Sequence, residues 1–169
     1  MMKARFEGKV WRFGDNVSTD GIAPGRLLYL RSKPEEYAKH VLEDVNTEFA
    51  KNVKKNDLIV AGNNFGCGSS REIAPLIIKL SGVGAILAKS FGRIFYRNAI
   101  NNGMLLIQCD TDPIKEGDKL LIDTEKCEIT KSGDPRFKMA FKLGEVEKRI
   151  LEEDGLLQYI EKHGSIRKL

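Results

Sequence analysis

The middle of the sequence alternates short apolar segments with helix-like segments, and no other feature constrains the fold as strongly. Residues 58–62, 84–90 and 104–109 have the length and apolar content of buried strands. The segments between them, 73–82 and 91–103, are typical of helices that end at a glycine. Buried strands that alternate with helices form parallel sheets. The centre of the chain therefore predicts a parallel β/α core, and the fold class is α/β.

The flanks of this core predict further elements. Before the core we expect a strand, a long polar loop and a helix opened by proline, at 6–13, 14–26 and 34–45. After it we expect a hairpin, an edge strand and a helical tail broken at Gly155, at 115–133, 136–142 and about 145–163. The length of 169 residues fits one domain. The sequence thus predicts a single α/β domain, 1–169, with a β-rich flank.

The composition is that of an ordinary globular protein. Hydrophobic residues make up 41% and charged residues 31% of the chain, which argues against disorder, collagen and coiled coil. No apolar run approaches the roughly 20 residues that cross a bilayer. The first residues lack the apolar segment of a secretory signal. We therefore expect a cytoplasmic protein without a membrane partner.

Cysteine and histidine are too few for a self-contained metal site. The three cysteines, Cys67, Cys109 and Cys127, show no C-x-x-C spacing, so neither a disulfide framework nor a zinc or iron–sulfur site is expected within the chain. His40 and His163 each lie in a charged, helix-like stretch and are interpreted as surface residues. The sequence therefore gives little support for a Ser-His-Asp triad or a Cys-His pair as the catalytic group.

Positive charge is concentrated in the centre of the chain. Residues 61–100 carry five lysines and arginines against Glu72 alone, a surplus equal to the formal net charge of +4. Nucleic-acid binding usually needs a denser basic stripe with stacking aromatics. The cations fit a site for a small anion better than a nucleic-acid site, although they are equally compatible with scattered solvated positions.

One glycine-rich loop, at 65–72, carries the residues most suited to chemistry. Its glycines let the backbone approach a ligand, and the helix expected after it favours anions at its first turn. Arg71 offers a planar fork for a carboxylate, and Ser69 and Ser70 add two hydroxyls. The alternative is structural: Ser69 caps the helix, and Glu72 completes a capping box. The loop matches neither a P-loop nor a nucleophile elbow.

Two weaker candidates accompany this loop. Ser18, Thr19 and Asp20, together with Arg26 and Arg31, form a polar cluster able to hold a second carboxylate, or else a solvated loop in which Asp20 caps a turn. The segment 95–98 is the other candidate, and its alternative interpretation is core packing with a surface arginine.

Three segments together resemble a known family. They are DNVSTD at 15–20, NFGCGSSRE at 64–72 and KSFGRIFYRNAIN at 89–101. In this order they resemble the small subunits of 3-isopropylmalate dehydratase and homoaconitase, the stand-alone form of the C-terminal domain of aconitase. The similarity extends from about residue 7 to residue 162. The resemblance implies a swivelling β/β/α domain like the C-terminal domain of aconitase.

The resemblance also implies a partner and a reaction. In this family a separate large subunit carries a [4Fe–4S] cluster, and the active site forms where the two subunits meet. This chain is therefore expected to bind no cofactor itself and to work in a heterodimer or heterotetramer. The implied reaction is the stereospecific dehydration and rehydration of a 2-hydroxy di- or tricarboxylate, which moves the hydroxyl by one carbon.

The family's roles transfer to matching positions. Ser69 matches the serine base, which removes the proton next to a carboxylate, and Asp20 matches an acid of the polar active-site loop. No histidine stands beside Ser69 in the sequence, so backbone N–H groups and Arg71 are expected to stabilise the alkoxide. The substrate-binding residues that the resemblance implies are Ser70, Arg71, Arg31, Thr19 and Gly68.

The substrate is expected to depend on the loop at 24–34. An apolar lining suits an isopropyl group, whereas Arg31, in the segment Tyr29–Ser32, resembles the homoaconitase version. Isopropylmalate is favoured because leucine-pathway enzymes are the commoner members; homoaconitate and dimethylmalate or citramalate are the alternatives. Ile73 stands where relatives often have His or Gln. Two other classes stay open: an anion-binding module without chemistry and, disfavoured by the modest charge, an RNA-binding protein.

Overall fold

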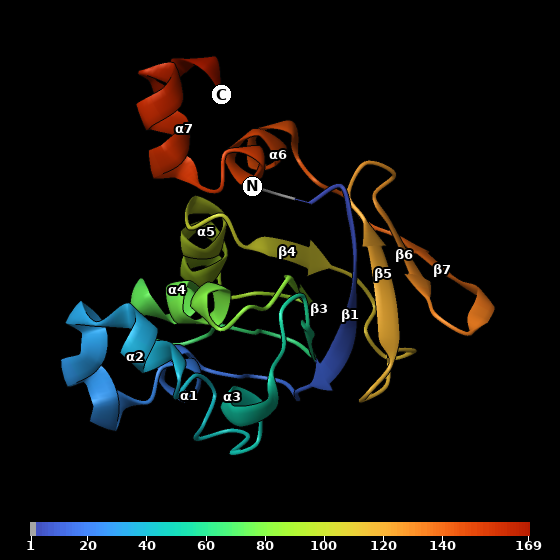
Figure 1. Cartoon of the computed structure of the whole chain (residues 1–169), viewed down its shortest axis with the longest axis horizontal. Helices are drawn as coiled ribbons and strands as arrows, with labels where there is room; N and C mark the ends of the chain where they lie inside the picture. Colours follow the sequence, from blue (N-terminus) through green and yellow to red (C-terminus); the bar gives the residue numbers. More distant parts are fainter. Residues whose placement is uncertain (1–2) are drawn as a thin grey trace.

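A computed structural model describes residues 3–169 of the chain. Within this part, seven strands form one sheet in the order β4-β3-β2-β1-β5-β6-β7 (Figure 1). The strands are β1 (Arg5–Arg12), β2 (Leu58–Ala61), β3 (Ala85–Ala88), β4 (Leu105–Gln108), β5 (Lys119–Asp123), β6 (Glu128–Lys131) and β7 (Asp134–Ala140).

One half of the sheet is the parallel β/α core that the sequence predicts. Strands β1 to β4 are all parallel, with Val10 opposite Leu58 and Leu58 opposite Ala85. Every residue of β2 and β3 is buried, and each large aliphatic side chain buried there contributes about 1.5–3 kcal/mol. The expected helices between these strands are α4 (Ile73–Leu80) and α5 (Arg93–Asn101).

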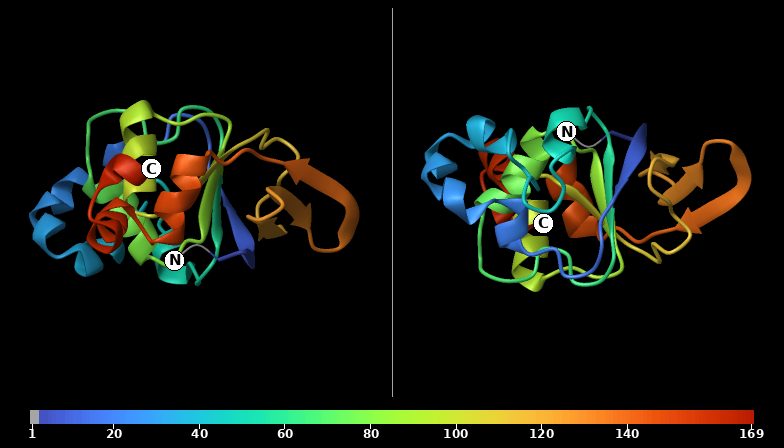
Figure 2. Two further views of the ribbon diagram at one scale, coloured as in Figure 1. Left: turned by 90° about the horizontal axis from the view of Figure 1, so that it is seen from above. Right: turned by 90° about the horizontal axis from the view of Figure 1, so that it is seen from below.

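The other half of the sheet is antiparallel. Strand β5 pairs with β1. The hairpin of β5 and β6 and the edge strand β7 follow, as the sequence predicts. Figure 2 shows β6 and β7 projecting from one side of the molecule, while the helices gather at the opposite side. The antiparallel arm therefore lies away from the helices that border the carboxyl ends of β1, β2 and β3.

The segment between β1 and β2 differs from expectation. The predicted polar loop contains α1 (Thr19–Ile22) and leads into the 3-10 helix η1 (Gly25–Ser32). The helix predicted over 34–45 ends early, as α2 (Pro34–Ala38). Leu42 has a φ of +57°, and its N–H donates to the Ile22 carbonyl at 2.9 Å. This long-range bond replaces the helical one, so the chain turns. The short helix α3 (Phe49–Asn52) was not expected.

The C-terminal tail forms helices as predicted. It consists of α6 (Glu145–Glu152), α7 (Leu156–His163) and the short η2 (Ile166–Lys168). Gly155, with a φ of +137°, separates α6 from α7. Lys79 of α4 holds this break in place, because its Nζ lies 2.8 Å from Asp154 Oδ1 and donates to the Asn102 carbonyl at 2.7 Å. The tail is thereby fixed against α4 and α5.

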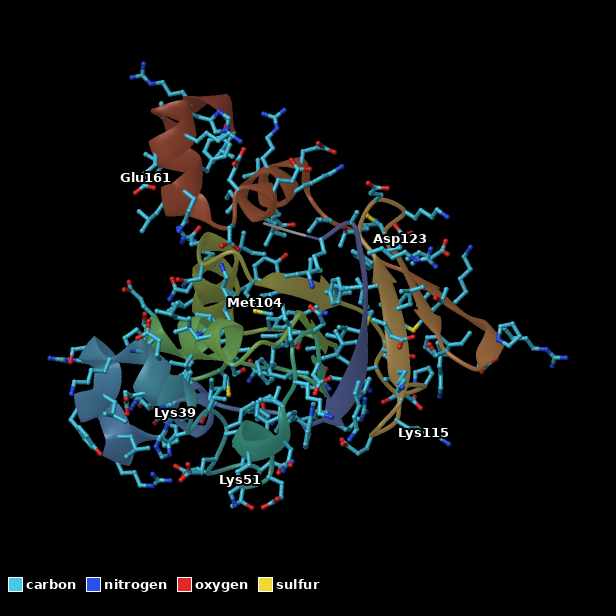
Figure 3. The ribbon with its side chains drawn as sticks, in the orientation of Figure 1. Lys39, Lys51, Met104, Lys115, Asp123 and Glu161 are labelled. Carbon is cyan, nitrogen blue, oxygen red and sulfur yellow. The ribbon has the colours of Figure 1, made fainter. Side chains whose placement is uncertain are left out.

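The core lies between the sheet and its helices. Figure 3 labels Met104, whose side chain lies within the molecule at the start of β4 and is 2% exposed. Trp11 packs edge-on against Phe49, with ring centroids 5.3 Å apart, and its indole N–H donates to Asp57 at 2.9 Å. Among the described residues, no helix is both long and apolar enough to span a membrane.

Candidate active site

Three loops meet at the carboxyl ends of β1, β2 and β3, the edge where open α/β sheets usually bind ligands. Short parallel bridges join them beyond the strands, between Ser18 and Cys67 and between Phe65 and Phe91. The Thr19 N–H donates to the Cys67 carbonyl at 2.8 Å. Segments far apart in sequence are thus fastened into one surface, and the glycine-rich loop lies in its middle.

Gly66 lets the glycine-rich loop pass close to α5. It has a φ of +78°, and an added Cβ would lie 2.2–2.6 Å from atoms of Phe95. Phe95 is 2% exposed and packs edge-on against Phe65 at 5.4 Å, so its ring cannot move aside freely. The glycine is therefore required here by both backbone conformation and space.

We expect Gly66→Ala to lower the melting temperature of the chain by about 5–15 °C. The left-handed backbone costs about 1–2 kcal/mol for an L-residue, and overpacking adds about 1–3 kcal/mol. Thermal unfolding followed by circular dichroism measures the change. Gly133→Ala is the matched control, because Gly133 has a φ of +84° but no atom within 4 Å of its Cβ position. Equal losses in both variants would contradict the crowding argument.

The alternative interpretation of the loop, in which Ser69 caps the helix and Glu72 completes a capping box, is wrong. Helix α4 begins at Ile73, its N-cap is Glu72, and no side chain caps it. A helix capped by Ser69 would place Pro75 in its interior, where proline removes a hydrogen bond and clashes with the preceding turn. With the observed start, Pro75 falls in the first turn, where a missing N–H costs nothing. Ser69 is thus free of a structural capping role.

Ser69, Asp20 and Arg71 come together although 49 or more positions separate Asp20 from the other two. Asp20 Oδ1 lies 2.7 Å from Arg71 Nη2 and 3.5 Å from Ser69 Oγ. The Arg71 side chain is only 20% exposed, whereas that of Asp20 is 62% exposed. Arg71 also donates to the Ala23 carbonyl at 3.4 Å. A fixed guanidinium and a carboxylate therefore flank the Ser69 hydroxyl.

Thr19 and Tyr37 are two buried side chains near the group formed by Ser69, Asp20 and Arg71. The Thr19 hydroxyl donates to the Ser69 carbonyl at 2.7 Å, and Thr19 is 2% exposed. Through this hydrogen bond, Thr19 holds the glycine-rich loop in place. The Tyr37 hydroxyl donates to the Pro24 carbonyl at 2.8 Å, and burial raises its pKa although the nearby Arg71 cation opposes that shift. Tyr37 is thus a neutral neighbour of the guanidinium.

A cavity of about 870 Å³ opens on one side of the loop. Ser70, Arg31 and Ile73 line it together with Ser69 and Arg71, so the structure brings Arg31 to the site. A second hollow of about 510 Å³ lies on the other side, where Gly68 adopts a φ of +94°. The two hollows share Ser69, Ser70, Arg71 and Asn98.

Some expected site residues lie elsewhere, and some lining residues were not expected. Arg26 pairs with Glu43 at 2.7 Å and Asp44 at 2.8 Å instead of joining the site. Of the segment 95–98, Phe95 packs in the core while Asn98 lines both hollows. Sequence reasoning missed the other lining residues of α5 and α7, because only the fold brings them near: Asn101, Asn102, Leu156 and Leu157.

The described part of the chain offers no donor set for a metal of its own. Within residues 3–169, no group of three or more His, Cys, Asp and Glu side chains is placed to hold an ion. Cys67, Cys109 and Cys127 are free thiols, and burial raises the pKa of Cys109 to about 11. A thiol kept protonated in this way, as that of Cys109 is, makes a poor iron ligand. The residues present do not fit a cluster held by this chain alone.

Comparisons with known proteins give relatives along nearly the whole chain. Residues 13–112 match the aconitase C-terminal domain family. The 3-isopropylmalate dehydratase small subunit 1 of Thermotoga maritima is 54% identical over 166 residues, covering 96% of this chain and 98% of that protein. The isopropylmalate/citramalate isomerase small subunit of Methanocaldococcus jannaschii is 46% identical over 163 residues, covering 95% and 96%.

Solved structures give the same result for the fold. A crystal structure of 3-isopropylmalate dehydratase from Methanocaldococcus jannaschii matches with a TM-score of 0.90 at 44% identity, covering 97% of this chain and 98% of that one. Aconitase X from Thermococcus kodakaraensis, with a TM-score of 0.51 and 17% identity, shares the fold alone over 77% and 92% of the two chains. The fold expected from the three sequence motifs is confirmed.

Proposed function

Because this chain belongs to the aconitase C-terminal domain family, among the small subunits of 3-isopropylmalate dehydratase, we propose that it supplies the base and the carboxylate-binding residues of that hydro-lyase. A small subunit of a two-subunit enzyme implies a large-subunit partner. The reaction converts 2-isopropylmalate to 3-isopropylmalate in leucine biosynthesis. The observation that carries the proposed roles is the Ser69–Asp20–Arg71 group beside an open cavity.

Ser69 acts as the base in this proposal. Its oxygen takes the proton from the carbon next to a substrate carboxylate, and the electron pair forms the double bond. The hydroxyl on the neighbouring carbon leaves and takes up one proton to become water, and the release of the proton that Asp20 accepted from Ser69 balances this uptake. Water then adds to the double bond with the two positions exchanged. A serine hydroxyl is a poor base, so Asp20, 3.5 Å from Oγ, has to accept its proton.

Arg71 and Ser70 hold a substrate carboxylate beside Ser69. The guanidinium is anchored by Asp20 and the Ala23 carbonyl, so little entropy is lost when it meets a ligand. A carboxylate bound there lies next to the carbon that loses its proton, and the positive charge stabilises the anion that develops. The chemistry expected from a [4Fe–4S] cluster on the large subunit is Lewis-acid assistance to the departing hydroxyl.

The proposed substrate class follows from the side chains that line the larger cavity, which are apolar in one part and include the cationic Arg31. Leu28, Ile73 and Leu76 line the cavity and suit a branched aliphatic substituent. Arg31 lines it as well and suits a further carboxylate. Homoaconitate is therefore the second candidate substrate, and citramalate is the third because the Methanocaldococcus jannaschii relative bears that name.

Reconstitution tests the proposed function and its substrate. The chain is mixed anaerobically with a cluster-bearing large subunit, and the ultraviolet absorbance of the unsaturated acid is followed with isopropylmalate, citramalate and homoaconitate. We expect turnover to be fastest with isopropylmalate and to vanish without the large subunit. Micromolar binding of a dicarboxylate to the chain alone, with no turnover of any acid in the complex, would instead identify a binding module.

Arg31→Val in the same assay tests the selector role of Arg31. We expect tricarboxylate turnover to fall at least about 10-fold, because the charge-assisted bonds to the extra carboxylate are lost, while isopropylmalate turnover is kept or raised. Arg26→Val is the matched control, since Arg26 pairs with Glu43 and Asp44. An unchanged substrate ratio in Arg31→Val would remove Arg31 from substrate recognition.

A further inference from the structure

The larger hollow is too big for the substrate alone. A seven-carbon hydroxy-dicarboxylate has about a dozen non-hydrogen atoms and needs at most about 360 Å³, if each takes the roughly 30 Å³ of a water molecule in the liquid. The cavity has about 870 Å³. More than half of this space is therefore left open to water or to another molecule.

Apolar side chains from two distant parts of the sequence line the larger hollow. They include Leu28 of η1 and Leu157 of α7. Leu157 is 70% exposed, and Tyr29, next to Leu28, is 73% exposed. Large apolar side chains gathered at the mouth of a site are typical of a surface that another protein covers.

The smaller hollow is lined by basic side chains as well as apolar ones. Arg93, Ile94 and Arg97 of α5 line it, and Ile94 is 53% exposed. Both arginines are exposed and have no acidic partner within residues 3–169. Since the two hollows share Ser69, Ser70 and Arg71, apolar and basic side chains lie on both sides of the glycine-rich loop.

We propose that this rim, made of Leu28, Tyr29, Ile94, Leu157, Arg93 and Arg97, docks the large subunit, with α7 as one of the two apolar contact points. The inference rests on the proposed function. Its occupant is an apolar segment bordered by acidic side chains, which complements the two unpaired arginines and fills the outer part of the larger hollow. Docking here closes the cavity and removes water from around Ser69.

The position of α7 makes it a dependable contact. Lys79 Nζ is 2.8 Å from Asp154 Oδ1 and 3.0 Å from the Asp154 carbonyl, so the turn before α7 is fastened to α4. Helix α7 also lies outside the region that matches the aconitase C-terminal domain family, 13–112. In Figure 3 the labelled Glu161 marks the outward face of α7. The proposed docking residue Leu157 thus belongs to the C-terminal tail and not to the region that matches the family.

Titration of the large subunit against the full chain tests this proposal. We expect Leu157→Asp to raise the dissociation constant of the complex about 10- to 100-fold, since a charge would be buried in an apolar contact. Ile166→Asp is the matched control: Ile166 is exposed on η2 and lines neither hollow. Its dissociation constant should stay at the wild-type value.

Arg97→Glu is a second variant that does not depend on the folding of α7. We expect it to raise the dissociation constant and to flatten its dependence on salt. Unchanged affinity in both variants, an equal loss in Ile166→Asp, or a lower kcat without a change in affinity would each overturn the docking role. Binding is measured apart from turnover, so a complex that forms but converts no acid would refute the proposed function and leave docking standing.

Discussion

Ser69→Ala should lower kcat of the reconstituted complex by about 10³-fold or more, the contribution expected of a positioned proton-transfer group. The methyl group cannot take the proton from carbon, whereas Arg71 and Ser70 still bind the carboxylate, so KM should change only a few-fold. Steady-state kinetics at saturating large subunit measures both constants. Ser69 is exposed and caps no helix, so the melting temperature of the chain should be nearly unchanged.

The neighbouring hydroxyl provides the control for this variant. Ser70 lines both hollows beside Ser69, and in the proposed mechanism it only donates a hydrogen bond to the carboxylate. Ser70→Ala should therefore raise KM about 10-fold, the cost of one hydrogen bond to a charged group, with kcat much less affected. If Ser69→Ala kept more than a tenth of wild-type kcat, the base would have to be another group.

Arg71→Lys should lower kcat/KM by about 10²-fold, mainly through a higher KM. The guanidinium is largely buried and held by Asp20 and the Ala23 carbonyl. Lysine presents a single point charge and lacks the planar pair of N–H donors with which a guanidinium binds a carboxylate. Losing one charge-assisted hydrogen bond costs about 1.5–3 kcal/mol, which corresponds to about 10- to 150-fold.

Arg26→Lys is the matched control for this substitution. Arg26 belongs to the same segment of the chain, but its partners are Glu43 and Asp44, away from both hollows. Its kcat/KM should stay within about 2-fold of wild type, because exposed ion pairs contribute at most about 1 kcal/mol. Equal kinetics in Arg71→Lys and wild type would show that the substrate carboxylate binds elsewhere.

The parallel core could be predicted because each of its signals is local. The predicted strands contain the continuously apolar runs Leu58–Ala61 and Ala85–Ala88. Gly103 ends the helix before the next strand with a φ of +73°. Length, hydrophobicity and a glycine stop are all read from neighbouring positions. The hairpin at 115–133 is signalled in the same way. The elements were therefore found where no distant contact decides the conformation.

Between β1 and β2, long-range contacts override the local sequence pattern that predicts a helix. The segment 34–45 has helical spacing, yet the bond from the Leu42 N–H to the Ile22 carbonyl turns the chain after Ala38. The spacing of Ser69 and Glu72 likewise indicated a capping box, and the conformational limits of Pro75 decided otherwise. In both places the sequence pattern was genuine, and a stronger constraint prevailed.

The residues of the site could be predicted from motifs, but their arrangement could not. Ser69 and Arg71 are two positions apart, so their proximity was expected. Asp20 reaches Arg71 only because β1 lies beside β2 and the loops after them are joined at Ser18 and Cys67. Leu156 and Leu157 border the same cavity because the distant Lys79 fastens the tail. Neither contact leaves a trace in sequence spacing.

In the proposed mechanism, Asp20 holds the guanidinium of Arg71 until the substrate arrives. An incoming carboxylate would take the guanidinium from a side chain that is 62% exposed and returns to water at little cost. The released Asp20 oxygen would keep Ser69 Oγ, at 3.5 Å, as a hydrogen-bond donor. Under this proposal, binding of an acid at Arg71 frees the proton acceptor that Ser69 needs, so that substrate binding and activation of the base are linked by one exchange of partners.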